Sequence, residues 1–230
     1  MNKVIVLSVL KTLLALFVIS SGLIHLSPDE AQYWTWSRHL DFGYYSKPPG
    51  IAYQIAFGTF LFGASELGVR FGSLLIGFLM PILIYRLSKQ AELSDEASFL
   101  ASFIWCLTPL GFIGSIFAIT DVGMILFWTC ALVILLKEGV RVKFALSIAC
   151  GALFKFPIYF LWPIALFFER PRLKWLSLIG VSLVGLVPTL IWNIQHDFVT
   201  FRHVGATLPG GTSALQSGGN FFSFIGSQIA

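Results

Sequence analysis

The sequence predicts an all-α polytopic membrane protein with about six to eight transmembrane or half-membrane helices. Hydrophobic residues make up 57% of the 230-residue chain. Charged residues make up only 11%, against roughly 25% in a soluble domain. The mean hydropathy is +0.83, and several apolar runs approach the roughly 20 residues that cross a bilayer. So few charges cannot cover a water-soluble surface, which excludes soluble enzymes, nucleic-acid-binding proteins and disordered chains.

The net charge of +4 fits the excess of Lys and Arg that membrane proteins carry on cytoplasmic loops. It is therefore a signal of orientation, and the expected partners include membrane lipids but no nucleic acid. The cysteines Cys106, Cys130 and Cys150 lie inside apolar runs. Their positions indicate neither a disulfide framework nor a metal site.

The first membrane pass is predicted over residues 4–26, with Lys3 and Lys11 placing the N-terminus in the cytoplasm. A cleaved signal peptide is the alternative, because the small residues at 20–22 suit a cleavage site. The further passes that follow favour a retained helix.

Residues 27–49 are polar and aromatic and would face the non-cytoplasmic side. Residues 50–64 are too short to span comfortably, so we predict an interfacial helix in this first outer loop. Three full passes are then predicted, at about 67–85, 97–118 and 121–136. Basic residues follow the first and third of these passes, which indicates returns to the cytoplasm.

Residues 144–168 allow two topologies, because Lys155 and Pro157 interrupt the apolar run near its middle. A single span would put the basic residues at 170–174 outside, against the charge bias. The sequence therefore favours a hairpin of two half-length helices that enters and leaves on the cytoplasmic side, with Lys155 at its buried tip. A last pass, about 175–192, would emerge outside.

A loop rich in Gly and Ser, 204–220, and an apolar run, 221–230, complete the sequence. The apolar run has no helix-ending signal. We expect residues 1–230 to form a single transmembrane domain that is truncated at its C-terminus.

The strongest local pattern is SPDEAQYWTWSRHLDFGYYSKPPG at residues 27–50. Ser27 and Glu30 have the spacing of a capping box, with Pro28 at the first helical position and Asp29 in the first turn. Capping alone explains these four residues. It does not explain the aromatic residues and the Lys-Pro-Pro that follow, although the aromatic side chains also suit an interfacial belt.

Lys47 precedes two prolines and a glycine. Pro48 favours an extended Lys47, and Pro49 with Gly50 is predicted to open the next helix. A fixed ammonium group would then lie just ahead of free backbone N–H groups, which suits a phosphate at the membrane surface. A lysine that snorkels to the interface is the alternative.

Asp121 and Lys155 are the remaining candidates for chemistry. Either Thr120 or Asp121 is predicted to be the N-cap of its pass, and Asp121 lies at the membrane level of Asp29. Two carboxylates there could hold a divalent cation, or one could act as a base while the other positions a substrate. An intramembrane lysine such as Lys155 is expected to face a cavity or a charged partner.

Taken in order, these motifs resemble those of the polytopic glycosyltransferases of the C superfamily, in particular the protein O-mannosyltransferases and the aminoarabinose lipid A transferase. The resemblance covers nearly all of the chain. It begins with Asp29-Glu30, Tyr33 and Trp36, and continues with GYYSKPPG at 43–50, SELGVRFGS at 65–73, AITDVGMILFW at 118–128, GALFKFPIYFLWP at 151–163 and PTLIWNIQHDFVTF at 188–201.

The resemblance implies an inverting enzyme of a bacterial inner membrane with a periplasmic or extracellular active face. Such an enzyme transfers a sugar from a polyprenyl-phosphate donor to a lipid, glycan or protein acceptor. The implied catalytic residues are Asp29 and Glu30, and the implied substrate-binding residues are Tyr33, Lys47, Arg70, Asp121 and Lys155. A divalent metal at Asp29 and Asp121 is compatible with this set but not required. Ser46 is a departure, because the aminoarabinose transferase has an acidic residue there.

In the mechanism that we expect, Asp29 accepts the proton of an acceptor hydroxyl while Lys47 and Arg70 steady the departing phosphate. A transporter or flippase of lipid-linked sugars is the alternative, and it predicts broken helices in corresponding positions of two halves. The sequence indicates one such break, at residues 155–157. A non-catalytic partner subunit, which would bind lipid without turnover, is a third interpretation.

Overall fold

The computed structural model describes residues 1–207, and within them the chain folds into helices without a β-strand. This confirms the predicted all-α class. The α-helices are α1 (Asn2–Ser20), α2 (Pro28–Ser37), α3 (Gly50–Phe62), α4 (Glu66–Gln90), α5 (Asp95–Leu107), α6 (Pro109–Ile113), α7 (Thr120–Glu138), α8 (Val142–Ala152), α9 (Leu161–Ala165), α10 (Lys174–Leu183), α11 (Val187–Gln195) and α12 (Val199–Thr207), with short 3-10 helices η1 (Phe156–Phe160) and η2 (Val184–Leu186). The apolar run 221–230 and most of the loop before it lie outside the described residues.

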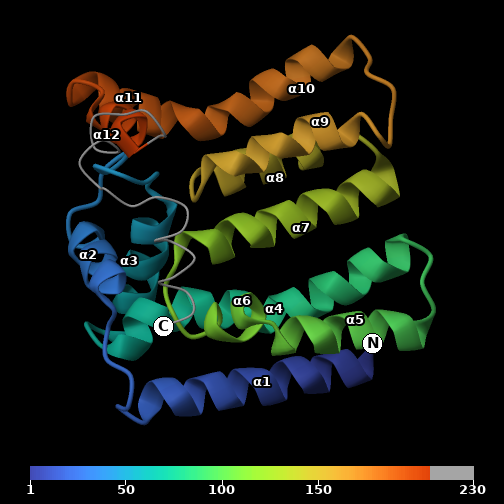
Figure 1. Cartoon of the computed structure of the whole chain (residues 1–230), viewed down its shortest axis with the longest axis horizontal. Coiled ribbons are helices and arrows are strands. Elements are labelled where there is room, and N and C mark those ends of the chain that lie inside the picture. Colours follow the sequence, from blue (N-terminus) through green and yellow to red (C-terminus); the bar gives the residue numbers. More distant parts are fainter. Residues whose placement is uncertain (208–230) are drawn as a thin grey trace, which may run out of the picture.

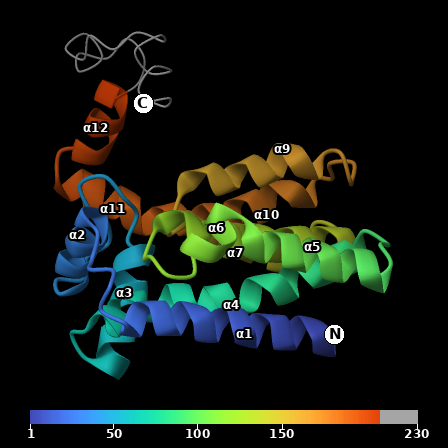
Figure 2. The same ribbon diagram turned by 60° about the horizontal axis from the view of Figure 1, so that its bottom comes forward.

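Four segments of the described chain are long and apolar enough to cross a membrane, namely α1, α4, α7 and the stretch Lys174–Gln195. These helices run side by side, so the bundle has two ends (Figure 1). At one, the α2–α3 end, α2 and α3 lie across the long helices (Figure 2). The other, the basic end, gathers the positive residues of the loops and helix ends: Arg86, Lys89, Lys137, Arg141, Lys143, Arg170, Arg172 and Lys174.

The two short helical arms of the predicted hairpin at residues 144–168 are confirmed, whereas its entry from the cytoplasmic side stays a prediction. α8 runs from the basic end toward the α2–α3 end, and η1 with α9 runs back beside it (Figure 1). The segment packs on α7 and α10 through a buried apolar cluster that includes Phe144, Ile148 and Ile158. Lys155 lies between the two arms in an extended conformation. Its side chain is 35% exposed, so it is less enclosed than the prediction of a buried tip implied.

The predicted pass over residues 97–118 crosses the bundle, but the prediction of one continuous helix is wrong. α5 ends at Leu107, α6 covers only Pro109–Ile113, and residues 114–119 are not helical. The cause is local, since Pro109 keeps Thr108 extended, with ψ 149°. The Thr108 hydroxyl then accepts a hydrogen bond from the Gly111 N–H at 3.0 Å, which starts a new helix instead of continuing the old one.

Lys11 is buried against α4 and is only 6% exposed. α1 ends at Ser20, earlier than predicted, but Lys11 still lies at its middle. Its Nζ donates to the Gly77 carbonyl at 3.0 Å. Pro81 lacks the N–H that would normally bond to that carbonyl four residues back. A lysine of one helix therefore satisfies the backbone group that a proline of another helix leaves open.

Candidate active site

The capping box predicted at the start of α2 is confirmed. The Ser27 hydroxyl accepts from the Glu30 N–H at 3.3 Å, and the Glu30 carboxylate accepts from the Ser27 N–H at 3.0 Å. Pro28 occupies the first helical position. Glu30 also has partners far away in the sequence.

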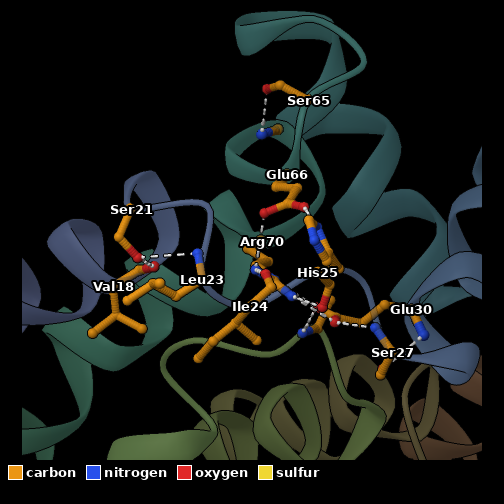
Figure 3. A network of polar contacts seen from close by, with 12 residues as sticks. Val18, Ser21, Leu23, Ile24, His25, Ser27, Glu30, Ser65, Glu66 and Arg70 are labelled. Carbon is orange, nitrogen blue, oxygen red and sulfur yellow. Dashed lines mark hydrogen bonds and ion pairs between the residues drawn. The ribbon is translucent and has the colours of Figure 1, made fainter.

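Glu30 and Arg70 form a buried, bidentate ion pair, which we call the closed pair (Figure 3). Arg70 Nε lies 2.9 Å from Glu30 Oε1 and Nη2 lies 3.0 Å from Oε2. Arg70 also donates to the carbonyls of Ile24 and His25, each at 2.9 Å. The Ala118 N–H donates to Glu30 Oε1 at 3.0 Å. Both side chains are 0% exposed.

The closed pair joins α2, α4, the connection after α1 and the segment before α7. Burial raises the pKa of Glu30, but the bonds from Arg70, Ala118 and Ser27 outweigh burial and lower the pKa overall. Since the charged atoms of both side chains are enclosed by protein partners, the geometry favours a positioning role. Direct contact of Glu30 or Arg70 with a substrate stays a prediction. The enclosed geometry of the pair does not favour it.

A second ion pair, which we call the open pair, joins Asp121 and Lys155. Lys155 Nζ lies 2.7 Å from Asp121 Oδ1, and the two side chains are 41% and 35% exposed for Asp121 and Lys155. α7 begins at Thr120, and its N-cap is the extended Ile119. The prediction that Thr120 or Asp121 caps this helix is therefore wrong, and the Asp121 carboxylate bonds the hairpin tip instead.

Tyr33 connects the open pair with α2. The phenol is buried, and its pKa is raised to about 12 by burial and then by the negative charges of Asp29 and Asp121. Tyr33 packs in one buried cluster with Ala118, three residues before Asp121, and Asp29 lies one turn before Tyr33 in α2, so the fold brings together three of the predicted site residues. Asp29 itself is exposed in the first turn of α2. Within residues 1–207 its carboxylate has no hydrogen-bond or ion-pair partner.

Lys47 lies on a loop that is fixed on both sides. The Tyr44 N–H donates to the Lys47 carbonyl at 3.1 Å, and α3 begins at Gly50 with Pro49 as its N-cap, as predicted. The lysine side chain is half-buried and makes no ion pair among residues 1–207. It is therefore a cation that remains available at this end of the bundle.

The Lys47 loop and the hairpin tip touch at Gly50. The Gly50 N–H donates to the Leu153 carbonyl at 2.7 Å. A Cβ at Gly50 would lie 2.6 Å from that oxygen, so only glycine fits without a backbone shift. This N–H is occupied and is not free for a phosphate, in contrast to the prediction. The contact nevertheless places the Lys47 loop beside the loop that carries Lys155.

A docking contact that sequence reasoning missed closes the same end of the bundle. Trp192 Nε1 donates to Asp41 Oδ2 at 2.9 Å, and the Trp192 ring stacks on His196 with centroids 4.1 Å apart. The Thr200 hydroxyl donates to the Tyr44 carbonyl at 3.1 Å. The two hydrogen-bonded pairs, Trp192 with Asp41 and Thr200 with Tyr44, are each more than 150 residues apart in the chain, so no spacing in the sequence could have linked them.

A divalent metal at Asp29 and Asp121 stays a prediction. Across residues 1–207, no group of three or more His, Cys, Asp or Glu side chains is placed to hold an ion. Asp121 already has the Lys155 ammonium at ion-pair distance, where a metal would otherwise sit. A bound metal would have to displace that ammonium and take most of its ligands from substrate and water.

The fold and the site define a helical membrane protein with charged residues gathered at one end of an apolar bundle. Residues 46–192 match the family of dolichyl-phosphate-mannose-protein mannosyltransferases. The chain belongs to this family, in agreement with the resemblance expected from its motifs.

Curated relatives agree with this assignment. The chain is 31% identical over 189 aligned positions to the lipid A galacturonosyltransferase RgtD of Rhizobium johnstonii, covering 76% of this chain and 40% of that protein. It is 27% identical to undecaprenyl phosphate-alpha-4-amino-4-deoxy-L-arabinose arabinosyl transferase 2 of Proteus mirabilis, covering 62% and 30%. A Yersinia enterocolitica arabinosyl transferase is 25% identical, covering 84% and 41%.

The chain thus spans between about a third and two fifths of the length of these relatives. No solved structure gives a significant match to it.

Proposed function

We propose that the protein transfers a sugar from a polyprenyl-phosphate donor to a lipid acceptor, with inversion, on the non-cytoplasmic face of a bacterial inner membrane. The observation that carries this proposal is the gathering of Asp29, Tyr33, Asp121 and Lys155 at one end of the bundle, beside the loop of Lys47. The long helices are otherwise mainly apolar, and the basic loops gather at the opposite end. By the charge rule, the acidic site would then face away from the cytoplasm.

Asp29 is the proposed general base. Its carboxylate is exposed and has no partner within the described residues, whereas Glu30 is enclosed by Arg70. In the proposed displacement, Asp29 takes the proton of the acceptor hydroxyl and the oxygen attacks the anomeric carbon. The bond from that carbon to the phosphate oxygen breaks, and its electron pair leaves with the polyprenyl phosphate.

The departing phosphate needs positive charge close to it. Lys47 and Lys155 are the proposed sources, because their loops meet at the Gly50–Leu153 contact. Arg70 was also predicted for this role, but its N–H groups donate to Glu30 and to two backbone carbonyls. We therefore assign the closed pair the task of holding α2, and with it Asp29, in place.

A lipid acceptor is favoured because the first relative is named as a lipid A transferase and the others as transferases that use an undecaprenyl phosphate sugar. The transporter interpretation gains some support from the second helix break, at Thr108 and Pro109. The names of the relatives favour transfer over transport.

The test is Asp29→Asn in the full-length protein. Asn keeps the shape of the side chain, so folding should be unchanged, while loss of a general base should lower the rate by at least about 100-fold. The measurement is sugar transfer in membranes or nanodiscs, from an undecaprenyl-phosphate-linked sugar to lipid A. Several sugars must be offered, because nothing in the described site selects one.

Asp197→Asn is the matched control. Asp197 is an exposed acid at the same end of the bundle, and its positive φ of 53° also suits asparagine. This variant should transfer at the parent rate. A near-normal rate for Asp29→Asn would reduce Asp29 to a residue of the first helical turn and would overturn the proposed mechanism.

A further inference from the structure

The basic end of the bundle holds a cavity of about 430 Å³ between the last turns of α4 and α7. Its lining includes Arg86 and Lys89 from α4 and Lys137 from α7, with Tyr85 and Val133 on the apolar side. No carboxylate lines it. Asp95 and Glu96 line a neighbouring cavity, and Glu138, which follows Lys137 in the chain, pairs with Lys143.

Two of the three basic side chains that line this cavity have no partner among the described residues. Lys89 is occupied, since its Nζ lies 3.0 Å from Asp95 and also donates to the Leu93 carbonyl. The charged groups of Arg86 and Lys137 make no hydrogen bond or ion pair among residues 1–207, and both residues are exposed. Arg86 and Lys137 line the same cavity from two different helices. A general excess of basic residues in the loops would not require this arrangement.

The depth of these residues indicates which anion would reach them. Arg86 lies 20 residues after the start of α4, or about 30 Å at 1.5 Å per residue. Lys137 lies 17 residues after the start of α7, or about 26 Å. The hydrocarbon core of a bilayer is about 30 Å thick. Suppose that the first residues of α4 and α7 lie at one membrane interface. Arg86 and Lys137 then lie at the level of the lipid phosphates of the opposite interface.

We propose that this cavity binds the phosphodiester headgroup of an anionic membrane phospholipid, held by Arg86 and Lys137. The acyl chains lie along the apolar surface of the bundle below it. The site is distinct from the acidic site at the α2–α3 end, and the proposal does not depend on the transfer activity.

The experiment measures the binding of phosphatidylglycerol and phosphatidylcholine to the purified full-length protein in detergent, by native mass spectrometry. The parent should prefer phosphatidylglycerol. Each cation near a membrane surface contributes about 1 kcal/mol to binding an anionic lipid. Arg86→Gln or Lys137→Gln should therefore reduce the preference about fivefold, and the double variant about 25-fold.

Arg170→Gln with Lys174→Gln is the matched control, because it removes one exposed Arg and one exposed Lys from the same end but outside the cavity. It should keep most of the preference. An equal loss in this control would mean that the lipid senses only general surface charge, and would overturn the proposal. So would saturation of the cavity by inorganic phosphate at millimolar concentration with no preference among lipids.

Discussion

The closed pair and the open pair lie at the same end of the bundle and contain similar charges, but they differ in every property that determines what an ion pair can do. Glu30 and Arg70 are 0% exposed and make two mutual bonds, with further bonds to four backbone groups. Asp121 and Lys155 share one contact of 2.7 Å and remain about 40% exposed. The first pair links four segments of the fold, whereas the second lies open beside Tyr33.

The difference in burial indicates which pair contributes to stability and which pair is accessible to a ligand. A buried pair is costly to break, because removing one partner leaves the other charged and enclosed. An exposed pair contributes little to stability, so its partners can be exchanged for those of a ligand. Residues of the closed pair should therefore affect folding first, and residues around the open pair should affect substrate binding first.

The largest expected effect is a loss of stability when the carboxylate of the closed pair is replaced by an amide, compared with the same replacement in the open pair. Glu30→Gln leaves the buried Arg70 guanidinium with only the partly exposed Glu66 carboxylate as a counter-charge, 3.5 Å from Nη1, and should lower the free energy of unfolding by about 3–5 kcal/mol. Asp121→Asn should lower it by less than about 1 kcal/mol. The measurement is reversible unfolding in detergent micelles.

A double variant, Glu30→Gln with Arg70→Met, checks the reason for that loss. It removes both charges, and it should recover part of the stability lost in Glu30→Gln. If the two amide variants unfold alike, the distinction between the pairs fails.

Lys47→Gln should have the next largest effect, on binding and not on stability. Loss of a charge-assisted hydrogen bond should weaken undecaprenyl phosphate binding by about 1.5–3 kcal/mol. Lys47→Arg should retain part of the affinity, because the charge persists in a different shape. Arg38→Gln, which removes another exposed cation at this end, is the control. Unchanged lipid phosphate binding by Lys47→Gln would leave Lys47 as an interfacial anchor.

Gly50→Ala tests the contact between the Lys47 loop and the hairpin tip. The new methyl group meets the Leu153 carbonyl, and forcing the backbones apart should cost about 1–3 kcal/mol of stability. Gly180→Ala is the control with the opposite sign, since a Cβ there meets nothing within 4 Å in the middle of α10. That change should stabilise by up to about 1 kcal/mol. Equal unfolding midpoints in thermal melts would show that the Gly50 contact is loose.

The smallest expected effect is a pH dependence of stability that originates in Glu30. Because its folded pKa is lowered, its contribution is fully present above the ordinary Glu value of about 4.3. That contribution should be lost as the pH falls through the lower, folded pKa. Glu30→Gln should flatten this part of an acid unfolding curve, and Asp121→Asn should not. An identical acid limb for the parent and Glu30→Gln would contradict the assignment.

Local patterns predicted much of this structure, because their causes lie within a few residues. The capping box at Ser27 and Glu30 and the helix start at Gly50 follow from side-chain and backbone preferences nearby. The hairpin around Lys155 followed from charge and hydropathy. Pro109 is an equally local signal, and it explains why the segment after α5 crosses the bundle as a broken helix and not as one continuous helix.

Long-range pairing was beyond reach. Nothing near Arg70 indicates that its partner is Glu30, which lies 40 residues away, and an arginine of this kind suits a phosphate equally well on chemical grounds. The same holds for the Trp192 contact with Asp41. Residue types indicated which residues are candidates for the site, but only the fold separates the enclosed charges from the accessible ones.

The bond between Lys11 and Gly77 also bears on the order in which the helices enter the membrane. An uncompensated lysine at the centre of a membrane helix costs about 2.5–3.5 kcal/mol on insertion scales, and its acceptor is made 66 residues later. Since α1 precedes α4 in the chain, we expect the Lys11 ammonium group to lack this acceptor until α4 is made, and the Gly77 carbonyl to lack a donor until it meets α1. Pairing the two removes both defects at once. This gives α1 and α4 a reason to associate early, as a nucleus on which the later helices assemble.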